Sequence, residues 1–276
     1  MTPLVIALAL SAAVLHATWN AFLRGGGDRL QTVTLMSVAS TVLAIPFVIA
    51  LPLPALAVWP YILASAVLQT AYSLFLVAAY RHGALGQVYP IVRGTVPVLV
   101  TLSAVVFAAQ RATPHEVLGV LLIAGGIASL ALGRARIPGR SLAYALCTGA
   151  IIAAYATIDS LGVRMADGSN AYTAWVLVGY GILLPLAHTI ARGRLRLDMR
   201  APETWRALAG GAVAVIAYAA VVAAFARGPA GPIAALRETS VLFATLIGWL
   251  FLGEKLSLLR VLASATVAVG AICLIQ

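Results

Sequence analysis

Long apolar stretches alternate with short polar segments along most of the chain. A helix needs about 20 consecutive apolar residues to cross the hydrocarbon core of a bilayer. Stretches of that length fill the sequence almost completely, so we predict an all-α integral membrane protein with ten transmembrane helices. The predicted helices cover residues 3–23, 30–50, 60–80, 86–108, 116–133, 141–163, 171–191, 206–226, 231–252 and 257–275.

Composition supports a membrane protein and excludes several functions. Hydrophobic residues make up 62% of the 276 residues and charged residues 9%, whereas soluble domains carry about 25% charged residues. The longest connection, 192–205, is too short to hold a soluble domain. The single lysine, Lys255, lies in GEKLS, which lacks the spaced glycines of a phosphate-binding loop. We therefore expect no ATPase activity, and without an H-E-x-x-H motif we expect no metal site and no cofactor.

Basic residues concentrate on alternate connections between the predicted helices. The net charge is +10, but the arginines are spread over short loops, so we expect no nucleic-acid partner. The positive-inside rule places the arginine-rich loops in the cytoplasm and both termini outside, in a multi-pass protein of the cell inner membrane. Counted from the N-terminus, the odd connections hold Arg24, Arg29, Arg81, Arg134, Arg136, Arg140, Arg192, Arg194, Arg196, Arg200, Arg206 and Lys255, and the even connections hold Arg111, Arg164 and Arg227.

The second half of the sequence repeats the first. AYRHGALGQVYPIVRGTVP around residue 83 aligns with AFARGPAGPIAALRETSVL around residue 228, and HATWNAFLR near the start aligns with YATIDSLGVR. We divide the chain into two five-helix repeats, 1–138 and 139–276. Because five is odd, the second repeat enters the membrane from the opposite side, so the repeats are inverted. Secondary transporters are commonly built this way, with the substrate site near the midplane between the halves.

The duplication, the GxxGxV and GxxGPI openings of the fourth and ninth helices, and the GEKLS that ends the ninth helix resemble the EamA type of the drug/metabolite transporter superfamily. The resemblance covers the whole chain. It implies that helices 1 to 4 and 6 to 9 surround a central cavity, with helices 5 and 10 peripheral, and that substrates are small metabolites or drugs. Two features depart from the family: Gln110 stands where a glutamate is expected, and well-studied relatives have cytoplasmic termini.

Two adjacent charged residues, Arg237 and Glu238, lie in the middle of the ninth predicted helix. An ionisable residue at the centre of a spanning helix costs about 3 kcal/mol on insertion scales, so we expect both to face the protein interior. Neighbours on a helix point about 100° apart, so we do not expect these two to pair with each other. The repeat aligns Glu238 with Arg93, which favours an ion pair between the fourth and ninth helices.

Arg237 then needs a different partner. Asp159 in the sixth helix is one candidate. A substrate carboxylate or phosphoryl group is another, because a guanidinium offers a planar pair of donors to such anions. Asp159 and Glu238 are also candidates for proton coupling. The alternative is a purely structural network that locks the two halves together.

Further candidates lie on the first and fourth helices. His16 and Asn20 share one helix face, and a histidine there either carries a proton or packs as a hydrogen-bonded core residue. Trp19 either stacks on substrate or packs as core. Tyrosines either line the cavity or anchor at the interface: Tyr72, Tyr80, Tyr89, Tyr155 and Tyr218. A break in the fourth helix, lining the cavity beside Arg93, is predicted from Pro90, Gly94 and Pro97.

These observations predict a transporter, not an enzyme. We expect secondary active or facilitative movement, as an exporter, of a small polar metabolite such as an amino acid or another anionic or zwitterionic compound, by alternating access. The alternatives are a hydrophobic-drug or lipid-headgroup exporter, and then an intramembrane enzyme or structural subunit. The expected partners are the substrate and the lipid bilayer, a monomer is expected to suffice, and a proton is the candidate coupling ion.

Overall fold

The computed structural model describes residues 1–23, 28–82, 85–131, 138–252 and 257–275. Four of the basic residues used to predict the orientation, Arg24, Arg134, Arg136 and Lys255, lie outside these ranges. The described elements are α1 (Pro3–Leu23), α2 (Arg29–Ala50), the 3-10 helix η1 (Leu56–Val58), α3 (Trp59–His82), α4 (Leu85–Phe107), α5 (Pro114–Ser129), α6 (Gly139–Met165), α7 (Ser169–Arg192), α8 (Pro202–Phe225), α9 (Ala230–Glu238), α10 (Ser240–Leu252) and α11 (Leu258–Ile275).

The predicted all-α membrane fold is confirmed. Within the described ranges, eight helices are long and apolar enough to cross a membrane. Helix α5 is shorter, with 16 residues. The ninth predicted helix is divided into two segments, α9 with 9 residues and α10 with 13. The ten predicted helices are therefore present, with the ninth interrupted near its middle.

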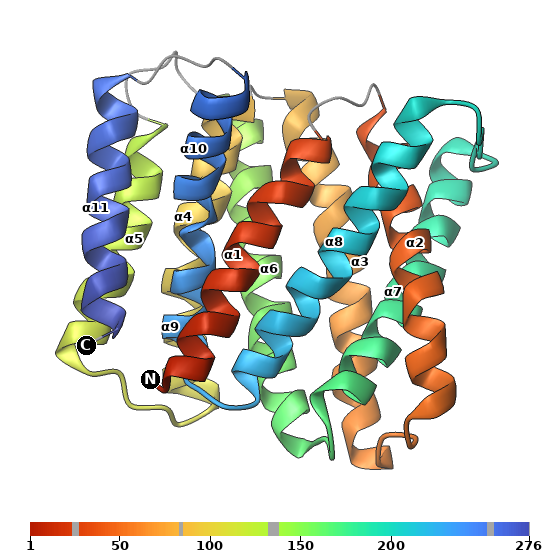
Figure 1. The fold of residues 1–276 in the computed structure, drawn as a ribbon, viewed down its shortest axis with the longest axis horizontal. Helices are drawn as coiled ribbons and strands as arrows, with labels where there is room; N and C mark the ends of the chain where they lie inside the picture. Colours follow the sequence, from red (N-terminus) through yellow and green to blue (C-terminus); the bar gives the residue numbers. More distant parts are fainter. Residues whose placement is uncertain (24–27, 83–84, 132–137, 253–256, 276) are drawn as a thin grey trace.

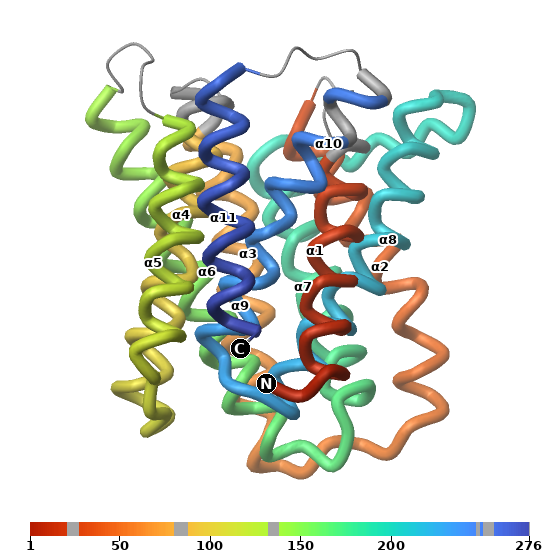
Figure 2. Tube along the Cα trace, turned by 60° about the vertical axis from the view of Figure 1, so that its left-hand side comes forward, coloured from red at the N-terminus to blue at the C-terminus, as the bar shows by residue number. Residues whose placement is uncertain are grey.

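The two halves of the chain are inverted relative to each other. Figure 1 shows α1 and α6 running in opposite directions, with both chain ends toward the same end of the molecule. Helix α1 packs against α8, and α6 packs against α3. These two contacts are equivalent, because α1 corresponds to α6 and α8 corresponds to α3 in the repeat. The pairs α2–α7 and α5–α11 lie on opposite sides of this core (Figures 1 and 2).

Glycines allow close approach in the outer pair of α5 and α11. A Cβ atom built on Gly270 would lie 2.8 Å from the carbonyl oxygen of Gly119. One built on Gly126 would lie 3.1 Å from the carbonyl oxygen of Ala263. Small residues at such interfaces permit the van der Waals contact that holds helices together in lipid. This packing gives the two helices the peripheral position that the resemblance implied.

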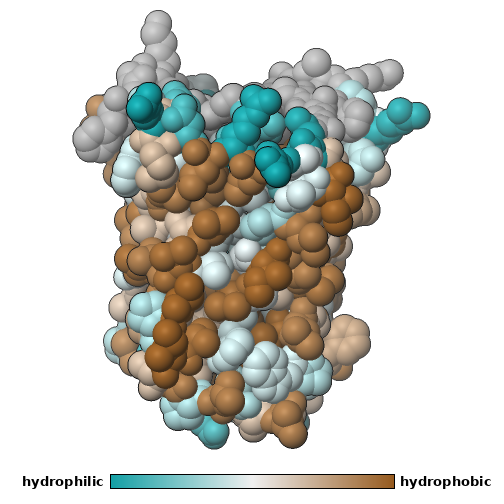
Figure 3. Space-filling model, turned by 90° about the vertical axis from the view of Figure 1, so that its right-hand side faces the viewer, coloured by the Kyte–Doolittle hydropathy of each residue, from teal (hydrophilic) through white to brown (hydrophobic). Residues whose placement is uncertain are grey.

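Polar side chains gather at the end of the molecule that carries the arginine-rich connections. Figure 3 shows hydrophilic residues at that end and a broad hydrophobic surface below it. Arg192 pairs with Asp28, with 3.3 Å between Nη1 and Oδ2. The Gln31 side chain donates to the carbonyl of Arg196 at 3.1 Å. These contacts join the connection after α1 to the connection after α7 at the polar end.

Candidate functional site

The ion pair expected between the two repeats is present. Nη1 of Arg93 on α4 lies 3.1 Å from Oε1 and 3.2 Å from Oε2 of Glu238 on α9. Arg93 is 4% exposed and Glu238 is 0% exposed. A charge-assisted contact to both carboxylate oxygens fixes orientation as well as distance. This pair therefore ties α4 to α9 in the interior of the bundle.

Contrary to the sequence-based expectation, Arg237 also pairs with its neighbour Glu238. Its Nη2 lies 3.1 Å from Oε1 of Glu238. The two residues are neighbours at the end of α9, and the long, flexible arginine side chain reaches back to the carboxylate. Among the described residues, Asp159 forms no ion pair with Arg237, and its two carboxylate oxygens accept hydrogen bonds from tyrosines. Glu238 thus serves two arginines.

The fourth helix is continuous. Helix α4 passes through both Pro90 and Pro97, since membrane helices tolerate proline where neighbouring groups satisfy the freed carbonyls. Gly94 serves close packing: a Cβ atom built on it would lie 3.0 Å from the carbonyl oxygen of Ala124 on α5. The predicted break in this helix is therefore not seen as an interruption, and Gly94 lets α4 pack closely against α5.

The interruption lies in the second repeat, at Thr239, which the alignment places opposite Gly94. The backbone N–H of Thr239 donates to the carbonyl of Leu236 at 3.1 Å. The Thr239 hydroxyl donates to the same carbonyl at 2.6 Å, and the N–H of Leu242 donates to Thr239 at 2.8 Å. Threonine hydroxyls compete with helical hydrogen bonds in this way. The resulting tight turn separates α9 from α10 directly beside the two arginines.

His16 on α1 contacts the group formed by Arg93, Arg237 and Glu238. We call these four residues the charge cluster. Its Nε2 contacts Nη2 of Arg93, and its Nδ1 accepts from Nε1 of Trp19 at 3.1 Å. The His16 and Trp19 rings meet edge to face at 4.8 Å. Arginine and indole are donors only, whereas a neutral imidazole has one acceptor nitrogen, so one tautomer satisfies only one of the two donors. Asn20 is outside the cluster, because its amide donates to the carbonyl of His16 at 2.7 Å.

Tyrosines surround the charged groups. The Arg93 guanidinium lies over the ring of Tyr89, 5.3 Å from the centroid, a favourable cation–π distance. The rings of Tyr72 and Tyr155 lie 6.1 Å apart. The contact with Arg93 favours a position inside the bundle over interfacial anchoring for Tyr89. The side chain of Tyr80 lies outside the described part of the structure.

The cluster carries more positive than negative charge. Two arginines face one glutamate, and the most exposed member, His16, is 9% exposed. Nε of Arg237 is buried and has no hydrogen-bond partner among the residues that the structure describes. A buried donor without a partner costs about 1–3 kcal/mol, and more on a charged group. The cluster therefore contains a cationic donor that an anion could satisfy.

Asp159 forms a second polar site, which sequence reasoning located only in part. Its Oδ1 accepts from the hydroxyl of Tyr172 at 2.9 Å and its Oδ2 from that of Tyr218 at 2.8 Å. The amide of Gln69 donates to Tyr218 and to Ser65, both at 3.0 Å. The missed signal was the spacing of polar residues on α3, where 65, 69 and 73 recur every fourth position and share one face.

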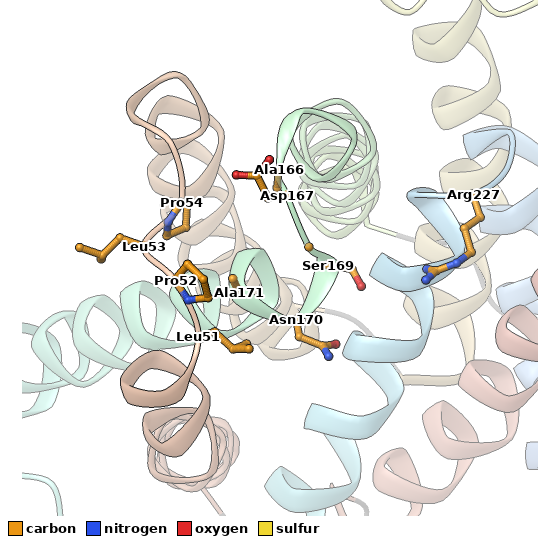
Figure 4. Close-up of a pocket in the computed structure, with 11 residues that line it drawn as sticks. Leu51, Pro52, Leu53, Pro54, Ala166, Asp167, Ser169, Asn170, Ala171 and Arg227 are labelled. Carbon is orange, nitrogen blue, oxygen red and sulfur yellow. The ribbon is translucent and has the colours of Figure 1, made fainter.

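Both sites are closed in this conformation. A hollow of about 340 Å³ lies between the α2–η1 and α6–α7 connections (Figure 4). Asp167 and Arg227 contribute charged groups to its wall. A second hollow of similar volume lies beside Phe75 and Tyr144. Neither of these two hollows is lined by a residue of the charge cluster, whose four residues are all buried.

Polar side chains fix the connection from α8 to α9. Nε of Arg164 donates to the carbonyl of Phe225 at 3.0 Å, and its guanidinium also contacts the carbonyl of Gly228. Oε1 of Gln110 accepts from the N–H of Ala230 at 3.1 Å. Gln110, which departs from the family pattern, thus caps the start of α9. These contacts close the end of the bundle opposite the arginine-rich connections.

Comparisons with known proteins agree with this architecture. The model of the EamA-like transporter family matches residues 3–132 and again residues 139–276. The alignment with one solved crystal structure covers 98% of this chain and 94% of the other chain. The sequence identity is 18% and the TM-score is 0.77, which shows a shared fold. No curated protein matches the chain significantly. Because the two family matches together span nearly the whole sequence, the protein belongs to the EamA-like transporter family.

Proposed function

We propose that the protein is a secondary active or facilitative exporter of a small anionic or zwitterionic metabolite, such as an amino acid. The observation that carries the proposal is the unpartnered Nε of Arg237, buried in a cluster with surplus positive charge. The break between α9 and α10 lies beside it. Interrupted helices near the midplane are where secondary transporters form their substrate sites.

Arg237 is the arginine best placed to take a substrate carboxylate. It shares one oxygen of Glu238, whereas Arg93 contacts both oxygens. If Arg237 turns toward a substrate, both oxygens of Glu238 keep their contact with Nη1 of Arg93 and no charge is left unpaired. A carboxylate binds a guanidinium best through two parallel N–H···O bonds, and the free Nε of Arg237 supplies one of these donors.

Charge also separates this proposal from drug export. A cationic drug would add positive charge to a buried cluster that already holds an excess. Burying an uncompensated charge in low dielectric is strongly unfavourable. An anionic group instead offsets the excess. The site therefore favours carboxylates and related anions over cationic drugs.

Alternating access requires the occluded cluster to open toward each side in turn. Helix α9 packs against α4 and α1, whereas α10 packs against α1 and α11. Because the turn at Thr239 separates the two segments, α9 and α10 do not have to move together as one rigid helix. We expect opening on one side to move α9 and opening on the other side to move α10, with Arg237 at the pivot.

Counterflow in liposomes tests the proposal. Liposomes that contain the purified protein are loaded with one unlabelled compound at a time, chosen from a panel of amino acids, carboxylates and cationic drugs. Uptake of the same compound in labelled form is then followed. We expect counterflow with a carboxylate-bearing compound. In Arg237→Gln, loss of a charge-assisted contact worth about 1.5–3 kcal/mol should raise the apparent KM by about tenfold or more. Arg200→Gln, on the exposed α7–α8 connection, is the matched control and should behave as wild type.

Two results would contradict the proposal. One is counterflow of a cationic drug without counterflow of any carboxylate. The other is a folded Arg237→Gln variant whose carboxylate counterflow equals that of Arg200→Gln. The second result would assign Arg237 to the structural network that ties the repeats together.

A further inference from the structure

The Asp159 site differs from the charge cluster because its carboxylate has only neutral hydrogen-bond donors. Asp159 is 0% exposed. In the described part of the chain, no arginine, lysine or histidine lies within ion-pair distance of it. Its donors are the hydroxyls of Tyr172 and Tyr218. An ionisable residue buried in a membrane helix without a countercharge is expected to serve a function.

The neighbouring amide orients this network. Gln69 donates through Nε2 to the oxygen atoms of both Ser65 and Tyr218. The Tyr218 hydroxyl therefore accepts from Gln69 and directs its own hydrogen to the carboxylate. An ionised carboxylate accepts several hydrogen bonds, whereas a protonated one becomes a donor and loses acceptor capacity. The arrangement seen here fits ionised Asp159, and protonation must release or reverse at least one of its contacts.

The network joins helices of both repeats. Ser65 and Gln69 lie on α3, Asp159 on α6, Tyr172 on α7 and Tyr218 on α8. Helix α8 packs along α1, the helix that carries His16 into the charge cluster. Release of a tyrosine contact would therefore loosen a helix that also supports the substrate site. A change of protonation at Asp159 thus has a structural route to the arginines.

Charge gives a second link between the two sites. The charged and titratable groups that face Asp159 are Tyr172 of α7, Tyr218 of α8 and, more distantly, Arg237 of α9. The closer groups of α3 are neutral. With Asp159 ionised and no substrate, the two arginines and the two carboxylates of the combined sites cancel. With Asp159 protonated and one anion on Arg237, the charges cancel again. The other two combinations leave a net charge in the membrane interior.

We propose that Asp159 is a proton-binding site and that each anion with one net negative charge crosses the membrane together with one proton. The inference rests on the proposed transport function and narrows its substrate class to such anions. The proton binds the Asp159 carboxylate from the side where the anion enters and leaves with it on the other side. Transport is then electroneutral, and outward flow occurs when the internal concentration of the anion outweighs the proton gradient.

Proton movement in liposomes tests this coupling. Labelled glutamate, lactate and other anions with one net negative charge are added singly to liposomes that contain a pH-sensitive dye. In wild type, we expect anion uptake to acidify the lumen at one proton per anion, with no change when a potassium diffusion potential is imposed. Asp159→Asn should retain anion counterflow and lose the acidification. Asp198→Asn, on the exposed α7–α8 connection, is the matched control and should keep both.

A second variant covers the case in which Asp159→Asn does not fold. Tyr218→Phe removes one donor that stabilises the ionised carboxylate, so the midpoint of the pH dependence of uptake should move upward by about one pH unit. Net anion uptake without acidification in wild type, or acidification retained in Asp159→Asn, overturns the inference and leaves the transport proposal standing. Absence of counterflow for every anion overturns both.

Discussion

Glu238 is the residue whose removal should damage the fold most, because one carboxylate serves two buried arginines. Glu238→Gln would leave Arg93 and Arg237, at 4% and 6% exposure, without an anionic partner. Breaking a buried ion pair by removing one partner costs about 3–5 kcal/mol, and two stranded cations place this variant at the upper end of that range. Arg237→Gln keeps the contact between Nη1 of Arg93 and both oxygens of Glu238, so we expect it to cost less than about 2 kcal/mol.

Thermal unfolding in detergent, followed by tryptophan fluorescence, measures the difference. For a chain of this size, 1 kcal/mol corresponds to about 2–4 °C in melting temperature. We therefore expect Glu238→Gln to melt about 10 °C or more below wild type and Arg237→Gln to lose about half as much or less. Glu203→Gln, at an exposed position in the first turn of α8, is the control and should change little. Equal losses for Glu238→Gln and Arg237→Gln would refute the assignment of Glu238 as the shared partner.

Two further predictions concern packing and orientation. Gly270→Leu should destabilise the α5–α11 contact, because its Cβ would lie 2.8 Å from the carbonyl oxygen of Gly119. Gly125→Ala on α5 should be tolerated, because no atom lies within 4 Å of the new Cβ. The melting temperatures of the two variants are compared, and equal stability would contradict the packing. A periplasm-active reporter fused after Gln276 should be active, because the arginine-rich connections favour external termini; silence with intact expression would reverse the orientation.

The features that depend on repeated pattern were predictable from the sequence. Apolar length located the ten helices, since the bilayer thickness sets the length of a spanning helix. The repeat offset aligned Arg93 with Glu238, and residues at equivalent positions near a twofold axis come close together. The Arg93–Glu238 ion pair could therefore be predicted without knowing how the helices pack.

Features that depend on local competition or on several helices at once were not predictable in this way. The break at Thr239 arises because its hydroxyl and its N–H both bond to Leu236, and the prolines of α4 gave a stronger but misleading signal. The hydrogen-bond partners of Asp159 come from α7 and α8, and Gln69 of α3 supports one of them. The only sequence signal for that site was the regular spacing of the polar residues 65, 69 and 73 on α3. Such spacing shows that one face of α3 is polar, but it does not show which helix that face contacts.

Divergence between the two repeats explains why the interior can hold charge at all. If the halves had kept identical residues, the position of Arg93 and Glu238 would present two like charges across the axis, and like charges in low dielectric repel strongly. Opposite charges at equivalent positions attract instead. The same asymmetry places Asp159 opposite Asn20, so only the second repeat offers a titratable carboxylate there, and it places Thr239 opposite Gly94, so only the second repeat is interrupted. The roles proposed for Arg237 in anion binding and for Asp159 in proton binding thus both fall to the second repeat, while the first repeat supplies their neighbours Arg93 and His16.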